Sequence, residues 1–99
     1  STVPTQALYF MNDPFVHQKS LLLGRRLQAD ASNDGDRVNM AYSLTLGRAP
    51  TSDERTKAES FLDAYRAELA ANGNPEVPAT ALAALARSLF ASNEFMHVD

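Results

Sequence analysis

The chain has 99 residues, 44% of them hydrophobic, and a formal net charge of −3. This length predicts one helical domain spanning residues 1–99. The absence of Cys excludes disulfides, thiolate metal sites and a Cys nucleophile. With 9 Lys and Arg against 12 Asp and Glu, the chain lacks the basic balance of duplex-binding domains, so we expect no nucleic acid partner. No apolar run approaches the ~20 residues that span a bilayer, so we expect no membrane insertion.

Two helices are predicted around Pro14. A short one covers residues 5–11, because Pro14 disfavours the helical conformation at Asp13. Pro14 itself suits the first turn of a second helix, which runs to about Ala29. The apolar face of this second helix is predicted to comprise Phe15, Val16, Lys19 with its aliphatic stem, Leu22, Leu23 and Leu27.

A third helix is predicted from about Asp36 to Leu46, with Ser32 or Asp34 as its N-cap. It is apolar on two sides, which predicts a central place in a bundle. One side carries Val38, Ala41, Tyr42 and Thr45, and the other carries Met40 and Leu44.

The fourth helix has the clearest start, because Thr51 and Glu54 are spaced as a capping box. Its apolar residues follow helical spacing as far as Leu69, and Gly73 favours a left-handed terminus. A fifth helix is predicted at about 79–92, followed by an apolar tail, residues 95–98, that docks on the bundle. No segment alternates like a strand. The sequence therefore predicts an all-α fold, a compact bundle of four main helices plus a short N-terminal helix.

The loop at residues 30–36 matches the first half of a calcium-binding loop, with oxygen ligands at the first, third and fifth positions and Gly at the sixth. Position twelve, which needs a bidentate acid, is Ala41. We therefore interpret this segment as an inter-helix loop, and we expect no metal.

Catalytic patterns are weak. His17 and His97 lie far apart without a metal-binding spacing, and the helical serines lack a nucleophile-elbow motif. No pair of carboxylates stands out, although paired-carboxylate hydrolysis stays open. We expect no catalytic, cofactor-binding or metal-binding residue in this chain and no cofactor.

The turn after the third helix resembles a helix-turn-helix corner, but Asp53 and Glu54 at the start of the next helix would face phosphates. We instead predict a structural turn. Gly47 supplies a left-handed cap, while Pro50 and Thr51 start the next helix. Arg48 is expected to satisfy free carbonyls or to pair with a carboxylate such as Glu94.

Three sequence blocks resemble the planctomycete-specific domain-of-unknown-function family 1553. Residues 3–16 (VPTQALYFMNDPFV) resemble its PxQALxLLNxPFV segment, and residues 41–51 (AYSLTLGRAPT) resemble its YxLxLGRxPT turn. Residues 89–99 (LFASNEFMHVD) are similar to its LLNSNEFLYVD ending, from which His97 departs. With Glu54 of the capping box added, these blocks give the structural motif residues Asn12, Asp13, Pro14, Gly47, Arg48, Pro50, Thr51, Glu54, Asn93, Glu94 and Phe95.

The resemblance implies the C-terminal module of a larger, exported bacterial protein, placed in the periplasm or on the cell surface. Parents of this kind often carry a haem-binding region, and their genes often neighbour sulfatases or related hydrolases. The family has no established reaction, so the resemblance supplies no catalytic residue.

Three functions remain open from the sequence. The first is a non-catalytic structural or interaction module that packs against other domains of its parent or against a protein partner. The second is a contribution to an enzyme active site in a polysaccharide-processing parent, drawn from the Asn12-Asp13 and Asn93-Glu94 corners. The third is carbohydrate binding through exposed aromatic rings.

Overall fold

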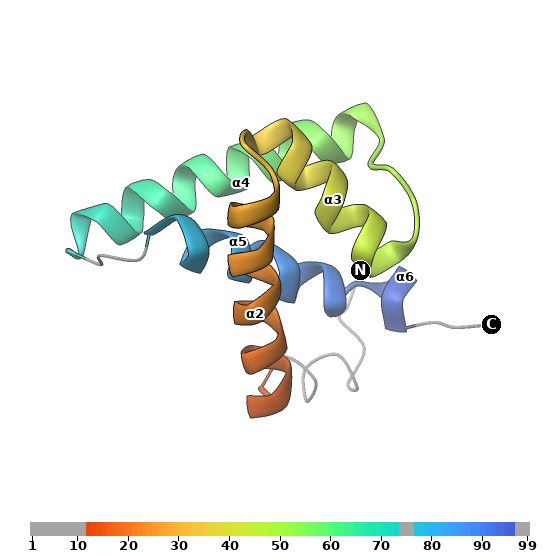
Figure 1. Ribbon diagram of the computed structural model, residues 1–99, viewed down its shortest axis with the longest axis horizontal. Helices are drawn as coiled ribbons and strands as arrows, with labels where there is room; N and C mark the ends of the chain where they lie inside the picture. The colour runs from red at the N-terminus through yellow and green to blue at the C-terminus, as the bar shows by residue number, and fades with distance from the viewer. Residues whose placement is uncertain (1–11, 74–76, 97–99) are drawn as a thin grey trace.

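The computed structural model describes residues 12–73 and 77–96. Across these ranges it contains helices and no strand, which confirms the predicted all-α fold. In chain order the helices are α2 (Pro14–Asp30), α3 (Asp34–Leu46), α4 (Ser52–Ala71), α5 (Val77–Phe90) and the short α6 (Asn93–Met96) (Figure 1). The Cα radius of gyration is 13.1 Å, which matches the ~13 Å of a compact chain of this length. The helix predicted over residues 5–11 lies outside the described residues.

The starts of α2 and α3 are set by polar caps. At α2, Asp13 accepts a hydrogen bond from the Phe15 N–H at 2.8 Å, and Pro14 occupies the first helical position. At α3 the cap is Asn33, whose side-chain oxygen accepts from the Asp36 N–H at 2.9 Å. The predicted caps Ser32 and Asp34 were therefore wrong. Asp34 is already part of the helix, where its negative charge interacts favourably with the positive end of the helix dipole.

Three other helix ends follow local signals that the sequence predicted. Thr51 and Glu54 form both bonds of a capping box at the start of α4. Gly47 after α3 and Gly73 after α4 have φ values of 71° and 72°, the left-handed conformation that glycine adopts without strain. The fifth helix ends at Phe90, earlier than predicted, because the chain turns there into α6.

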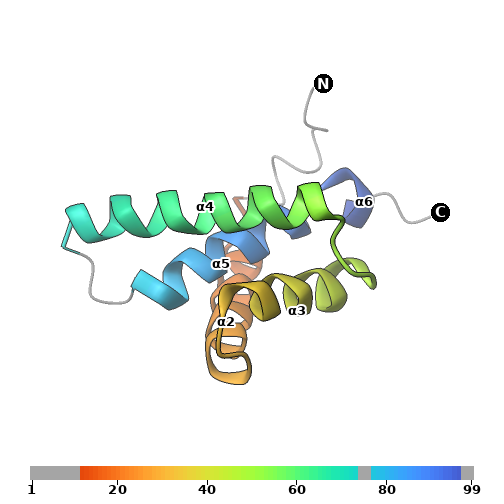
Figure 2. The ribbon, with the colours of Figure 1, turned by 90° about the horizontal axis from the view of Figure 1, so that it is seen from above.

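The centre of the bundle is α5, which packs against α2, α3, α4 and α6 (Figures 1 and 2). The prediction that the third helix is central was wrong, since Leu44 on α3 is 44% exposed. Small alanine side chains let neighbouring helices approach α5 on several sides. Its buried residues are Ala79, Ala81, Leu82, Ala83, Ala84, Leu85, Ala86 and Leu89.

The predicted apolar face of α2 is also partly wrong. Phe15 is 63% exposed and Leu22 is 49% exposed. The face that meets α5 is instead built largely from small residues, because the two helices cross almost backbone to backbone. A Cβ added at Gly24 would lie 2.6 Å from the Ala83 nitrogen and 2.7 Å from the Ala79 carbonyl oxygen. The buried residues of α2 are Val16, Ser20, Gly24 and Leu27.

Candidate functional site: an arginine-bridged corner and an apolar groove

Arg48 lies in the turn between α3 and α4, and its guanidinium joins two carboxylates from separate helices. It donates from Nη1 and Nη2 to Glu54 at 2.7 and 2.9 Å, and from Nε and Nη2 to Glu94 at 2.7 Å each. Nη1 also donates to the Ala49 carbonyl at 3.0 Å. A guanidinium has five N–H donors, so all of them are engaged. The structure contains the predicted Arg48–Glu94 pair and adds Glu54, which the sequence did not predict as a partner.

The backbone of the turn brings these groups together. Gly47 reverses the chain after α3, and its N–H donates to the Ser43 carbonyl at 3.1 Å. Glu54 Oε1 accepts from the Thr51 N–H at 2.9 Å while the Thr51 hydroxyl accepts from the Glu54 N–H at 3.2 Å. Glu54 therefore serves twice, as one half of a capping box and as a partner of Arg48. The Arg48 guanidinium lies 5.6 Å from the centroid of the Tyr42 ring, within cation–π range.

The side chains of Arg48, Glu54 and Glu94 are stabilised in their ionised forms at this corner. Hydrogen bonds from Arg48 and Thr51 lower the pKa of Glu54 to about 2, and Arg48 also lowers the pKa of Glu94. The two carboxylates raise the pKa of Arg48 in turn. A general acid or base works best with a pKa near the operating pH. The corner is therefore a salt-bridge network that connects helices, and the pKa values of its carboxylates do not suit proton transfer near neutral pH.

The other motif residues are distributed along the edges of the bundle. Asn12 lies in the turn before α2, and the Asp13 carboxylate caps that helix. Asn93 begins α6, and the Phe95 ring packs edge to face on Phe90 at a centroid distance of 5.2 Å. Of the two acids in the enzyme corners considered from the sequence, Asp13 therefore caps α2 and Glu94 is bonded to Arg48.

The acidic loop at residues 30–36 is held by internal partners. Asp34 accepts from Arg66 at 2.6 and 2.9 Å, and this hydrogen bonding lowers the Asp34 pKa. Asp36 accepts from the Asn33 side-chain amide at 3.0 Å. Nowhere in residues 12–73 and 77–96 do three or more His, Cys, Asp or Glu residues come together as a metal site. The Asp34–Arg66 bridge between α3 and α4 was not predicted from the sequence.

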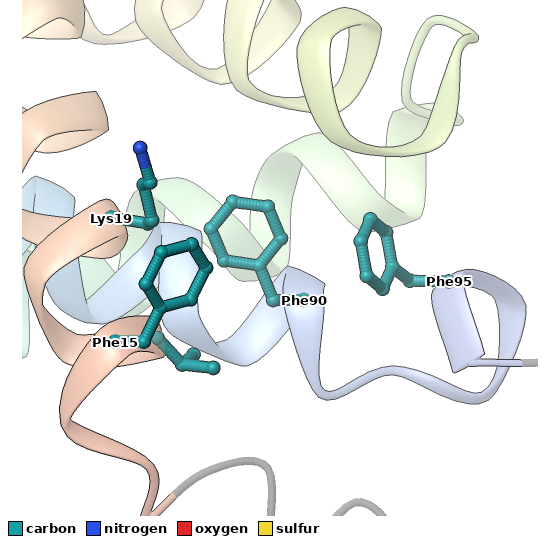
Figure 3. Close-up of a pocket in the computed structure, with 5 residues that line it drawn as sticks. Phe15, Lys19, Phe90 and Phe95 are labelled. Carbon is teal, nitrogen blue, oxygen red and sulfur yellow. The ribbon is translucent and has the colours of Figure 1, made fainter.

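An apolar groove is lined by residues of α2, α3, α5 and α6. It consists of two hollows of about 230 and 360 Å³ that share Lys19 and Phe90. Figure 3 shows the Phe15 ring of α2 next to the Phe90 ring of α5, with Phe95 beyond them. Val16, Leu22, Leu23, Arg26 and Leu44 complete the lining. The sequence missed this groove because it placed Phe15 and Leu22 in the core.

A third hollow of about 220 Å³ lies beside the arginine-bridged corner and is lined by residues of α3, α4 and α5. Its acid, Glu54, is bonded to Arg48, and the Ser88 hydroxyl donates to the Leu85 carbonyl at 2.7 Å. An acid and a hydroxyl that line this hollow are thus already engaged within the fold.

The two aromatic pairs found among the described residues do not form a flat platform of the kind that stacks on a sugar ring. The Phe61 and Tyr65 rings are inclined by 41° and the Phe90 and Phe95 rings by 67°. These pairs therefore give the carbohydrate hypothesis no support.

Fold and corner together define an all-α module in which a loop arginine ties the start of one helix to the C-terminal helix. The chain belongs to the family described as PSD1, protein of unknown function (DUF1553), whose model matches residues 1–62. The match includes Arg48 and Glu54, whereas Glu94 and the third resembling block lie beyond it. No curated protein and no solved structure matches the chain. In the described part of the chain, every helix is too short or too polar to cross a membrane.

Proposed function

We propose that the chain is a non-catalytic helical module that uses the apolar groove to pack against other domains of a longer protein or against a protein partner. The supporting observation is the exposure of its large apolar side chains. Phe15, Leu22 and Leu44 are 63%, 49% and 44% exposed and all line the groove. A contiguous exposed apolar surface is typical of an interaction site.

The polar chemistry of the described residues supports a structural role. The arginine-bridged corner holds both of its carboxylates in salt bridges, with the Arg48 donors fully used. A substrate anion would have to displace Glu54 or Glu94 to bind there. The corner therefore fixes α4 and α6 relative to α3, which keeps the neighbouring groove in shape.

The motif resemblance extends the proposal to the cellular setting. It supports a module at the C-terminal end of an exported, extracytoplasmic bacterial protein, placed among polysaccharide-processing enzymes. In that setting the groove would bury its side chains within the assembled protein.

Cysteine accessibility tests this proposal, because the chain contains no native Cys. Single variants Leu22→Cys and Leu44→Cys are treated with a maleimide in the isolated chain and in the protein assembled in its own bacterium. We expect rapid labelling of both in the isolated chain and strong protection of both in the assembly. Phe61→Cys, which is outside the groove at 37% exposure, serves as the control and should label in both. Equal labelling of all three variants in the assembly would refute the proposal.

A further inference from the structure

We infer that the apolar groove receives an amphipathic helix whose apolar seam is flanked by Asp or Glu side chains; this inference rests on the proposed function. The first support is the spacing of residues along α2. Phe15, Lys19, Leu22 and Arg26 follow one another at intervals of four, three and four, and all four line the groove. This is the spacing of residues that face a partner helix packed alongside.

The shape of the groove also fits a helix. Side chains of one helix insert as knobs into holes between side chains of the facing helix. The groove offers two neighbouring hollows, of about 230 and 360 Å³, that share Lys19 and Phe90 in their linings and can receive side chains of a partner helix. Residues 15–26 extend over ~17 Å at 1.5 Å per residue, so the groove accommodates about three turns of a partner.

The charge of the groove sets the chemistry of the partner. Its charged lining residues are Lys19 and Arg26, and no carboxylate lines either hollow within the described residues. The Lys19 ammonium lies over the Phe15 ring at 5.3 Å, beside the apolar floor. Arg26 has a weak pair with Asp30 at 3.4 Å, with both side chains more than half exposed. The groove is thus positively charged although the chain as a whole has a net charge of −3. Its two cations complement carboxylates that lie on either side of an apolar seam on the partner.

Two other occupants fit less well. Basic segments that bind anionic membranes typically carry 4–8 Lys or Arg, whereas two line this groove, and its surface is hollowed. A second copy packed groove to groove would bring Lys19 and Arg26 of both chains together. Outside the groove, its large exposed apolar side chain among the described residues is Phe61 alone. One side chain does not make a seam.

The test uses the 99-residue chain and two synthetic helical peptides of ~18 residues. Both peptides have the same leucine seam, flanked by Glu in one and by Lys in the other. Fluorescence anisotropy measures affinity, and amide chemical shifts locate the contact. We expect the Glu-flanked peptide to bind at least ~10-fold more tightly, because like charges across an interface are strongly unfavourable. The shifts should centre on the residues of the groove.

Variants separate the contributions of shape and charge. Leu22→Ser and Leu44→Ser should each weaken binding of the Glu-flanked peptide by ~10-fold, in line with loss of a central apolar contact. Phe61→Ser is the matched control and should bind as the unaltered chain does. The double variant Lys19→Glu, Arg26→Glu should reverse the preference in favour of the Lys-flanked peptide.

Several results would overturn the inference. These are equal affinity for the two peptides, a preference that survives the charge reversal, and chemical shifts centred away from the groove. Binding of the chain to phosphatidylglycerol vesicles, if the charge-reversed variant no longer binds them, would point to a membrane instead. A dimer of the chain that Leu44→Ser converts to a monomer would point to a second copy instead. If the cysteines at positions 22 and 44 are protected in the assembly while the peptides show no charge preference, only this inference fails. If those cysteines are not protected, the proposed function fails with it.

Discussion

Replacement of Gly24 by Ala tests the close crossing of α2 and α5. The added Cβ would lie 2.6 Å from the Ala83 nitrogen, 2.7 Å from the Ala79 carbonyl oxygen and 2.9 Å from the Ala83 Cα. All three neighbours are backbone atoms, so no side-chain rotation relieves the overlap. The helices would have to separate by about 0.8 Å to restore the ordinary contact distance of 3.4 Å.

The cost of this separation can be set against the gain in helix propensity. A gap of 0.5–1 Å forfeits roughly a quarter to a half of the dispersion energy of each contact that opens, and overpacking a core typically costs ~1–3 kcal/mol. Ala in place of Gly in a helix interior returns ~1 kcal/mol. The difference is ~0–2 kcal/mol. We expect a net loss in the upper half of that range, about 1–2 kcal/mol, because all three close contacts are with backbone atoms at the main interface of α2. That loss lowers the melting temperature by ~4–16 °C in a domain of this size.

Thermal unfolding followed by far-UV circular dichroism measures this effect. Gly35→Ala in α3 is the matched control, because its Cβ would meet side-chain atoms, the nearest at 3.3 Å on Asn33. It should leave the melting temperature unchanged or raise it. If Gly24→Ala is as stable as the unaltered chain, the backbone-to-backbone crossing described for α2 and α5 is wrong.

Three further predictions concern polar groups. The Ser20 hydroxyl is buried without a hydrogen-bond partner, so Ser20→Ala should raise the free energy of unfolding by ~1 kcal/mol in urea titrations; a loss of stability would contradict this. The pKa of Glu54 falls from 4.5 to about 2 on folding, so its contribution is complete above pH 4.5 and is lost as the pH falls towards 2. Glu54→Gln, which keeps a capping-box residue, should therefore be less stable at pH 7 and show a flatter stability profile across that window, whereas an unchanged profile would contradict the role of Arg48. A double-mutant cycle with Asp34→Ala and Arg66→Ala should give a coupling of ~1 kcal/mol, and additive losses would show that the bridge contributes nothing.

The four main helices and several of their ends were predictable because their signals are local, although the N-cap of α3 and the end of α5 were placed wrongly. The capping box of Thr51 and Glu54 and the left-handed Gly47 and Gly73 depend on neighbouring residues alone, and the structure contains all of them. The pairing of Arg48 with Glu94 was one of two alternatives predicted for this side chain, the other being free backbone carbonyls, because a guanidinium near a helix end can donate to either. The sequence of the turn did not predict that Glu54, which already forms the capping box, also binds the Arg48 guanidinium.

The packing of α2 was not predictable from hydropathy. A hydrophobicity pattern assigns Phe15 and Leu22 to the inside and leaves Ser20 and Gly24 without a role, yet the structure buries the latter pair. The deciding property is size. Ser20 and Gly24 are four residues apart, so together they form a shallow strip on one face of the helix. Sequence periodicity contains no information about whether a partner such as α5 is itself small enough to fit that strip.

This inversion of α2 bears directly on function. Burying a Phe or Leu side chain contributes ~1.5–3 kcal/mol, and in a domain of ~100 residues, whose total stability is ~5–15 kcal/mol, such a contribution is large. The chain nevertheless leaves Phe15 and Leu22 about half or more exposed while it buries the unpartnered hydroxyl of Ser20. An arrangement shaped by the stability of the isolated chain alone would favour the opposite orientation. The outward orientation of Phe15 and Leu22 becomes favourable when another apolar surface covers them. This supports the proposal that the groove, rather than the saturated arginine corner, is the interaction site.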